Sequence, residues 1–157
     1  PDGSRAGQGA VPYTWTPTGT VYGTSVANST GSVATIRALG ETLLAADMLT
    51  LESDDLPPNQ FGFCLAAPAE GFVLNLGGGM GTLCLGAPIA RLLVPPAGQI
   101  QFSGPSGEFR LRSSMLSLPI GVRPSAGETW HFQGWFRDIV VGNFTSNTTD
   151  AIRFTYN

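Results

Sequence analysis

Apolar and polar residues alternate with a period of two along most of the chain from residue 31 onward. The alternation is clearest in residues 49–53 (LTLES) and around FRLR within residues 107–117. A period of two is typical of strands with one buried face, and Gly, Pro, Ser and Asn clusters separate the segments. On the same grounds we expect further strands at residues 32–39, 60–65, 71–76, 82–86, 89–94, 99–102, 128–138 and 151–156.

The longest predicted strand, residues 128–138, divides its side chains between two faces. One face carries aromatic rings, Trp130, Phe132 and Phe136. The other is more polar and carries His131, Gln133, Trp135 and Arg137.

A helix is conceivable at residues 41–48 (ETLLAADM), which fit a loop or a strand nearly as well. Strands and helices do not alternate, which argues against a parallel sheet. The sequence therefore predicts an all-β fold, a single antiparallel β-sandwich of the jelly-roll or immunoglobulin-like kind.

The first 22 residues differ from the rest. Residues 1–10 show no periodicity and are expected to be a flexible leader. Residues 11–22 are rich in β-favouring side chains, but Pro12 and Pro17 exclude a regular helix and a central strand. We therefore expect a leader and extended arm over residues 1–22 and a β-sandwich domain over residues 23–157.

Two interpretations of this arm remain open. It either covers an edge of its own domain or links to an upstream domain, or it adds as a strand to a neighbouring subunit. In the second case, head-to-tail addition does not close and yields filaments. The side chains expected to make the contacts are Val11, Tyr13, Trp15, Val21 and Tyr22.

Composition narrows the functional classes. Charged residues make up 12% of the 157 residues, lysine is missing, and 42% are hydrophobic, which is enough for a core. A net charge of −3 argues against nucleic acid as a partner. No apolar run reaches the roughly 18 residues of a membrane-spanning helix, so we expect no membrane insertion. A lysine-free surface rich in Thr, Ser, Gly and Asn favours an extracellular or cell-surface location.

No motif predicts catalysis. Residues 77–81 (GGGMG) precede a strand and lack the lysine of a phosphate loop, which indicates a hairpin loop with positive φ angles. His131 is the only histidine, and no Gly-x-Ser-x-Gly elbow accompanies it. We expect His131 to be a solvent-side or a hydrogen-bonded strand residue and the protein to have no enzymatic activity.

Calcium is the one cofactor that the sequence suggests. Loop-end carboxylates can bind calcium in a sandwich, and Asp138 and Asp150 are the candidate ligands. The alternative is that both residues cap turns or pair with Arg137 or Arg153.

Cys64 and Cys84 are the only cysteines, and each is central in a short apolar segment. In an extracellular domain such a pair usually forms a disulfide, which we predict here. The alternative is two buried free thiols that behave as small hydrophobes.

Surface modification and sugar binding form another group of candidates. Sequons place candidate glycosylation at Asn28, Asn143 and Asn147, although Thr and Asn turns explain them equally well. His131 and Trp135 are candidate ligand-facing residues. Exposed aromatic rings can pack on sugar faces, which makes Trp135, Tyr13 and Trp15 candidates for a sugar-stacking platform, although each fits a core or strand position as well.

Several segments together carry a family resemblance: residues 28–31 (NSTG), 49–51 (LTL), 56–62 (LPPNQFG), 83–91 (LCLGAPIAR), 98–101 (GQIQ), 127–138 (GETWHFQGWFRD) and 145–150 (TSNTTD). Over roughly residues 22–156 the chain resembles an uncharacterised module at the C-termini of large secreted proteins of planctomycetes and similar environmental bacteria. The resemblance implies a secreted β-module, and it carries no activity and no catalytic residue.

The chain departs from this family at its cysteines. The family usually has Cys beside Tyr where this chain has Tyr22-Gly23, and an aromatic or aliphatic residue where this chain has Cys64. The resemblance thus implies that the disulfide to Cys84 has changed partner.

These observations favour a non-catalytic structural or adhesive module of the cell surface or matrix, with a filament subunit as one form of it. Its partners would be further copies of itself or other cell-surface and matrix proteins. A carbohydrate-binding module of a secreted enzyme, with glycans as ligands, is the alternative.

Overall fold

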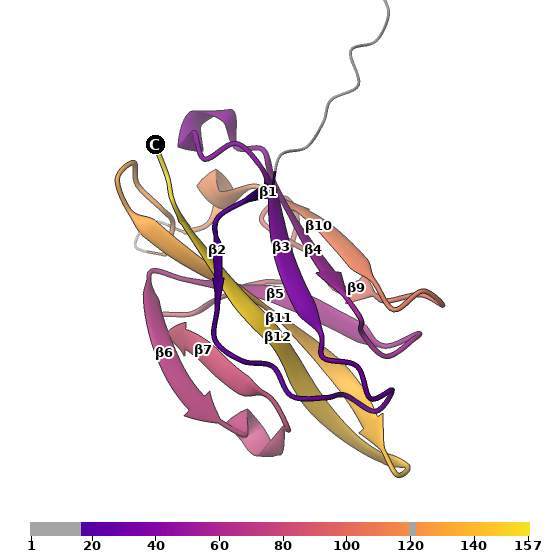
Figure 1. The fold of residues 1–157 in the computed structure, drawn as a ribbon. Helices are drawn as coiled ribbons and strands as arrows, with labels where there is room; N and C mark the ends of the chain where they lie inside the picture. Colours follow the sequence, from indigo (N-terminus) through magenta and orange to yellow (C-terminus); the bar gives the residue numbers. More distant parts are fainter. Residues whose placement is uncertain (1–16, 120–121) are drawn as a thin grey trace, which may run out of the picture.

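The computed structural model describes residues 17–119 and 122–157. Its strands form two main sheets that pack face to face, together with a separate two-stranded hairpin (Figure 1). Every strand pair is antiparallel. The predicted all-β antiparallel sandwich is therefore confirmed. None of the helices in the described part has the length and apolar character to cross a bilayer.

The first sheet has four strands in the order β1-β3-β4-β10. Their bounds are β1 (Pro17–Thr18), β3 (Thr35–Gly40), β4 (Leu49–Asp54) and β10 (Phe109–Ser113). The outer face carries a row of charges, in which Glu52 on β4 lies between Arg37 on β3 and Arg110 on β10. Arg37 Nε lies 2.5 Å from Glu52 Oε2, and Arg110 also pairs with this carboxylate.

The second sheet has the order β2-β12-β11-β5-β8, and β9 also pairs with β5. Its strands are β2 (Thr20–Tyr22), β12 (Asn143–Thr155), β11 (Thr129–Val140), β5 (Phe61–Ala67), β8 (Ala90–Leu92) and β9 (Gln101–Phe102). The hairpin consists of β6 (Ala69–Leu74) and β7 (Thr82–Gly86). Three 3-10 turns complete the structure, η1 (Leu44–Ala46), η2 (Leu76–Gly78) and η3 (Met115–Ser117).

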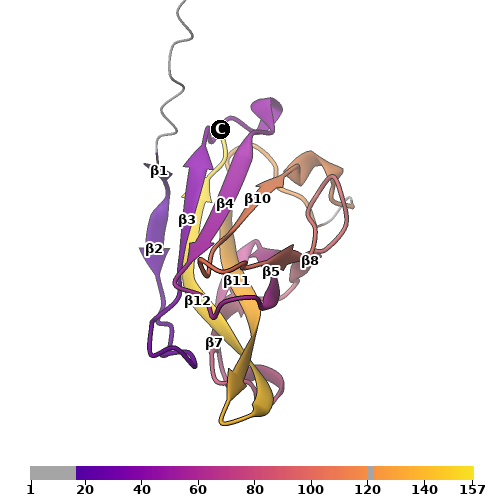
Figure 2. The same ribbon diagram turned by 90° about the vertical axis from the view of Figure 1, so that its right-hand side faces the viewer.

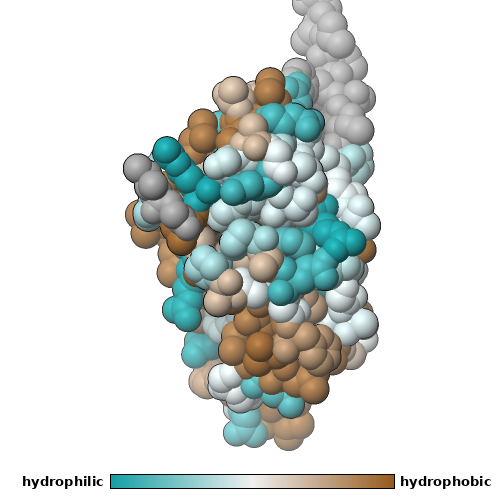
Figure 3. Space-filling model, turned by 90° about the vertical axis from the view of Figure 1, so that its left-hand side faces the viewer, coloured by the Kyte–Doolittle hydropathy of each residue, from teal (hydrophilic) through white to brown (hydrophobic). Residues whose placement is uncertain are grey.

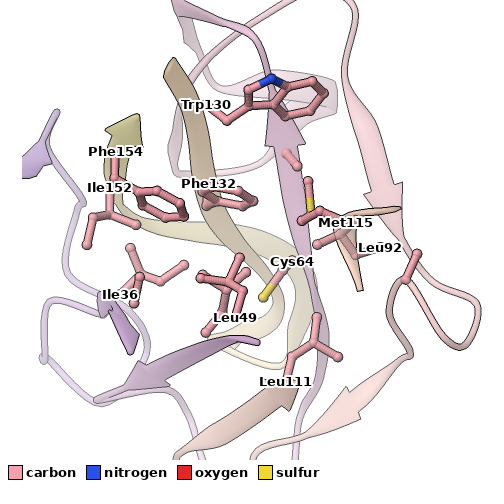
Figure 4. Close-up of a cluster of buried hydrophobic side chains, with 14 of the residues drawn as sticks. Ile36, Leu49, Cys64, Leu92, Leu111, Met115, Trp130, Phe132, Ile152 and Phe154 are labelled. Carbon is pink, nitrogen blue, oxygen red and sulfur yellow. The ribbon is translucent and has the colours of Figure 1, made fainter. Parts of the chain in front are cut away.

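The main core lies between the two large sheets (Figure 4). Trp130, Phe132 and Phe136 are all at most 2% exposed and point into it, as their spacing predicts. Phe132 stacks on Phe154 of β12, with ring centroids 5.2 Å apart. The aromatic face of β11 is thus the centre of the sandwich.

The opposite face of the second sheet is also covered. Leu65 and Ala67 of β5 pack against Leu83 and Leu85 of β7 in a smaller cluster, and Trp135 packs against it. The β6–β7 hairpin therefore adds a third layer on this face. Its connection contains η2, where Gly77 and Gly78 have φ angles of 64° and 83°, so the predicted hairpin loop is confirmed.

The first described segment closes one side of the sandwich. Thr18 of β1 pairs with Ala38 of β3, and after Gly19 the chain moves to the other sheet, where Val21 of β2 pairs with Ile152 of β12. Figure 2 shows β1 and β2 following each other along one side of the molecule. Val21 and Tyr22, predicted as arm residues, therefore pair within their own domain.

The predicted Cys64–Cys84 disulfide is wrong, because both cysteines are buried free thiols. Cys64 belongs to the main core, and Figure 4 shows its sulfur among the core side chains. Cys84 lies on β7, which covers the other face of the second sheet. The sheet itself thus separates the two thiols. Burial raises the pKa of Cys64 to about 12, so its thiol is protonated at neutral pH.

The structure places a different position next to Cys84. A Cβ added to Gly23 would lie 2.5 Å from Cys84 Sγ. In a disulfide that distance is roughly 3 Å, so a small shift would suffice. A cysteine at position 23 would thus be next to Cys84. The expectation that a disulfide to Cys84 has changed partner is also wrong, because both cysteines are free thiols.

We predict that Gly23→Cys forms a disulfide with Cys84. Closing a loop of this length stabilises the fold by about 4 kcal/mol in the chain-entropy model. The positive φ of 72° at this position subtracts about 1–2 kcal/mol for a non-glycine residue. Urea unfolding should show a net gain of about 2 kcal/mol that is lost on reduction. Mass spectrometry should find the cross-link retained with Cys64→Ala and absent with Cys84→Ala; the reverse pattern would contradict this placement.

Candidate functional site

A buried amide, that of Gln133 on β11, helps to hold the β6–β7 hairpin on the second sheet. Gln133 is 0% exposed. Its Oε1 accepts the N–H of Cys84 at 2.9 Å. Its Nε2 donates to the carbonyl oxygens of Thr82 at 2.9 Å and Thr149 at 2.8 Å. Side chains, rather than another strand, thus satisfy this edge of β7.

Tyr22 and His131 also stabilise the position of β7 on the second sheet. The Tyr22 hydroxyl donates to the carbonyl of Cys84 at 3.0 Å and lies 2.9 Å from His131 Nδ1. Since the hydroxyl has one proton, His131 Nδ1 donates to the Tyr22 oxygen. Burial lowers the pKa of His131 and raises that of Tyr22 to about 12. Both groups are neutral at pH 7 and hold β7 in place.

Of the two roles expected for His131, the structure shows the hydrogen-bonded one and not the solvent-side one. His131 is 5% exposed. It contributes to a shallow polar depression that also includes Thr20, Glu70 and Arg153. Arg153 pairs with Glu70 there.

With β7 docked on the sheet, β6 becomes the outermost strand of the hairpin. Among the described residues, β6 pairs with β7 alone. Its large apolar side chains remain in solvent: Phe72 is 71% exposed, Val73 44% and Leu74 61%. Leu76 in η2 is 43% exposed and continues the patch. Figure 3 shows a hydrophobic area in the lower half of the side on which β6 lies.

A groove of about 590 Å³ lies between the end of this hairpin and the second sheet. Trp135 forms one wall and stacks on Phe63 with ring centroids 4.8 Å apart. Its lining is otherwise mostly apolar and consists of Leu65, Leu76, Gly77, Leu83, Ile89, Arg91 and Ser146. Trp135, predicted as ligand-facing, therefore does line a groove.

We use the name β6 surface for three adjoining features. They are the outer edge of β6, this groove, and the exposed residues Phe72, Val73, Leu74 and Leu76. Exposed apolar patches of this kind mark interaction sites, and an open strand edge is a template for a further strand. The sequence predicted the strand but not its exposure. The available signal was the run Phe72-Val73-Leu74, in which consecutive apolar residues cannot all face one side of a sheet.

The two candidate calcium ligands serve separate backbone sites. Asp138 is 0% exposed and accepts the N–H groups of Ser29 at 3.0 Å and Ile139 at 2.8 Å. Asp150 accepts the N–H of Ile36 at 2.7 Å, and burial raises its pKa. In the described ranges, no three His, Cys, Asp or Glu residues are grouped as metal ligands. Calcium binding stays a prediction.

The three sequon asparagines differ in access. Asn28 is 6% exposed, and its Nδ2 donates to the carbonyl of Asp55 at 2.6 Å. Asn147 is 1% exposed and donates to the carbonyl of Val26. Asn143 begins β12 and is exposed. Glycosylation stays a prediction, with Asn143 as the accessible position.

The remaining arm residues, Val11, Tyr13 and Trp15, lie outside the described residues.

In comparisons with known proteins, the chain matches no family model, no curated protein and no solved structure. Functional inference therefore depends on the geometry of the β6 surface and on the sequence.

We predict that Gln133→Leu destabilises the fold by about 3 kcal/mol, because the buried N–H of Cys84 and carbonyl of Thr149 lose their Gln133 partner at about 1–3 kcal/mol each, while the Thr82 carbonyl keeps the Thr148 hydroxyl. Urea unfolding measures the change. Gln101→Leu is the matched control, since Gln101 Nε2 is buried without a partner. Its removal should leave stability within about 0.5 kcal/mol or raise it. Equal losses in the two variants would contradict the role of Gln133.

Proposed function

We propose that this protein is a non-catalytic structural or adhesive module of the cell surface or matrix that self-associates through its N-terminal arm. The observation that carries this proposal is the β6 surface, an open strand edge with three consecutive exposed apolar residues, Phe72, Val73 and Leu74. Such a surface favours a protein partner in extended conformation.

The titratable groups support a structural role. His131 supports Tyr22, and the carboxylates of Asp138 and Asp150 accept backbone N–H groups. Each group is thus occupied in stabilising the fold. The lysine-free composition and the resemblance to a secreted bacterial module support a location outside the cell.

Carbohydrate binding is the second candidate, and the aromatic wall of Trp135 and Phe63 is the observation in its favour. Sugars also need several converging polar groups for their hydroxyls. The side chains of the groove that offer them are Arg91 and Ser146. An apolar protein segment therefore fits the groove better than a sugar.

The arm of a second copy is a suitable partner because it is long enough to reach the β6 surface of a neighbouring subunit. Sixteen residues precede Pro17 in the sequence. Fully extended, they would span up to about 53–58 Å. Residues 17–22 belong to the sheets, so an arm acting between subunits would consist of residues before Pro17. Head-to-tail addition then yields open filaments.

We predict that sedimentation velocity of the full chain shows species growing with concentration, starting from the 16.4 kDa monomer. The double variant Tyr13→Asp with Trp15→Asp should remain a monomer, because charges replace the apolar contacts of the arm. Thr14→Asp, on the alternate face of an extended arm, is the control and should still assemble. A full chain that stays monomeric at every concentration would refute the proposal.

A further inference from the structure

We propose that residues 11–15 of a second copy add as a strand to the outer edge of β6, with Val11, Tyr13 and Trp15 directed at the β6 surface. This inference rests on the proposed function and identifies the acceptor site. Four features support it. The outer edge of β6 is unpaired among the described residues, and the surface beside it is apolar. The donor segment is uncharged, and β1 and the η2 end of the hairpin lie at opposite ends of the subunit.

The acceptor edge is left open by the way the hairpin docks. The edge of β7 that faces the sheet is satisfied by Gln133 and Tyr22, while β6 lies on the far side of β7. A strand that adds there gains main-chain hydrogen bonds without displacing an existing strand. The edge is thus preformed.

The donor segment, residues 11–15, and the β6 surface both carry mainly uncharged side chains. The sequence has no charged residue between Arg5 and Arg37, so the arm brings no charge into the contact. On the acceptor, Glu70 is already paired with Arg153. The groove between η2, β7 and the second sheet meets the exposed apolar residues at Leu76. It is large enough for an aromatic side chain, and its wall of Trp135 and Phe63 suits Tyr13 or Trp15.

The position of Pro12 fits this pairing. In a strand, alternate residues direct their N–H and C=O groups to opposite edges. If Tyr13 and Trp15 bond to β6, the backbone nitrogen of Pro12 lies on the outward edge, where a missing N–H costs no hydrogen bond. Proline there also blocks the addition of a further strand, which limits growth to the head-to-tail direction.

The ends of the subunit have the polarity that a filament needs. In Figures 1 and 2, β1 and the C-terminus lie at one end of the sandwich. The hairpin end with η2 lies at the other end in Figure 1. The strand β1, which the donor segment precedes in the sequence, and the η2 end of the acceptor surface thus lie at opposite ends of the molecule.

The test uses two full-length variants. The donor-deficient variant carries Tyr13→Asp and Trp15→Asp and keeps an intact β6 surface. The acceptor-deficient variant carries Phe72→Asp and Leu74→Asp and keeps an intact arm. Because Phe72 and Leu74 are 71% and 61% exposed, the fold should survive, which circular dichroism checks. Val94→Asp, 70% exposed elsewhere, is the control and should assemble as the unsubstituted chain does.

Each variant alone should sediment as a monomer, and an equimolar mixture should form a one-to-one dimer and nothing larger. Assembly of the acceptor-deficient variant alone, while the donor-deficient variant stays monomeric, would overturn the β6 site and leave the proposed function intact. Two monomeric variants that form no dimer when mixed would also overturn it. An unsubstituted chain that never assembles would refute both proposals.

Discussion

The buried amide of Gln133 determines how the third layer of this protein is arranged. It bonds to the main chain of both β7 and β12, and it does so from the centre of β11. A strand edge satisfied by side chains needs no neighbouring strand, so β7 can lie against the sheet while β6 is its only strand partner in the described part. The exposure of an apolar edge on β6 is a direct consequence of this arrangement.

In contrast to β6, each of the two main sheets has an edge that another strand covers. The segment from Pro17 to Tyr22 adds β1 to one sheet and β2 to the other, which covers an edge of each. Tyr22 of the same segment also bonds to the hairpin through Cys84. One extended stretch therefore ties all three layers together.

Much of the fold could be predicted because side-chain alternation reports burial directly. The aromatic face of β11 and the Gly77–Gly78 loop follow from period and turn chemistry alone. The first half of β12 could not, since Asn143–Asp150 has no apolar alternation. That half is a strand because it pairs with β11. Its buried polar side chains find local partners, such as Asn147 Oδ1 with the N–H of Thr148.

The site was harder to predict than the fold. Trp135 was identified from its place on the polar face of β11, but the partner wall and the groove depend on how the hairpin docks. The disulfide prediction was wrong for a related reason. The alternation of side chains along a strand indicates that Cys64 and Cys84 are each buried, but it does not indicate on which side of a sheet each one lies. Pairing across layers is a tertiary property, and local pattern does not contain it.

Amide hydrogen exchange of the assembled chain reports on the β6 edge itself. If residues 11–15 pair with β6, the amides of β6 exchange at least about tenfold more slowly in assembled protein than in the monomeric Tyr13→Asp, Trp15→Asp variant, since a paired edge must open before it exchanges. Unchanged exchange in β6, with new protection on another strand edge, would contradict this pairing.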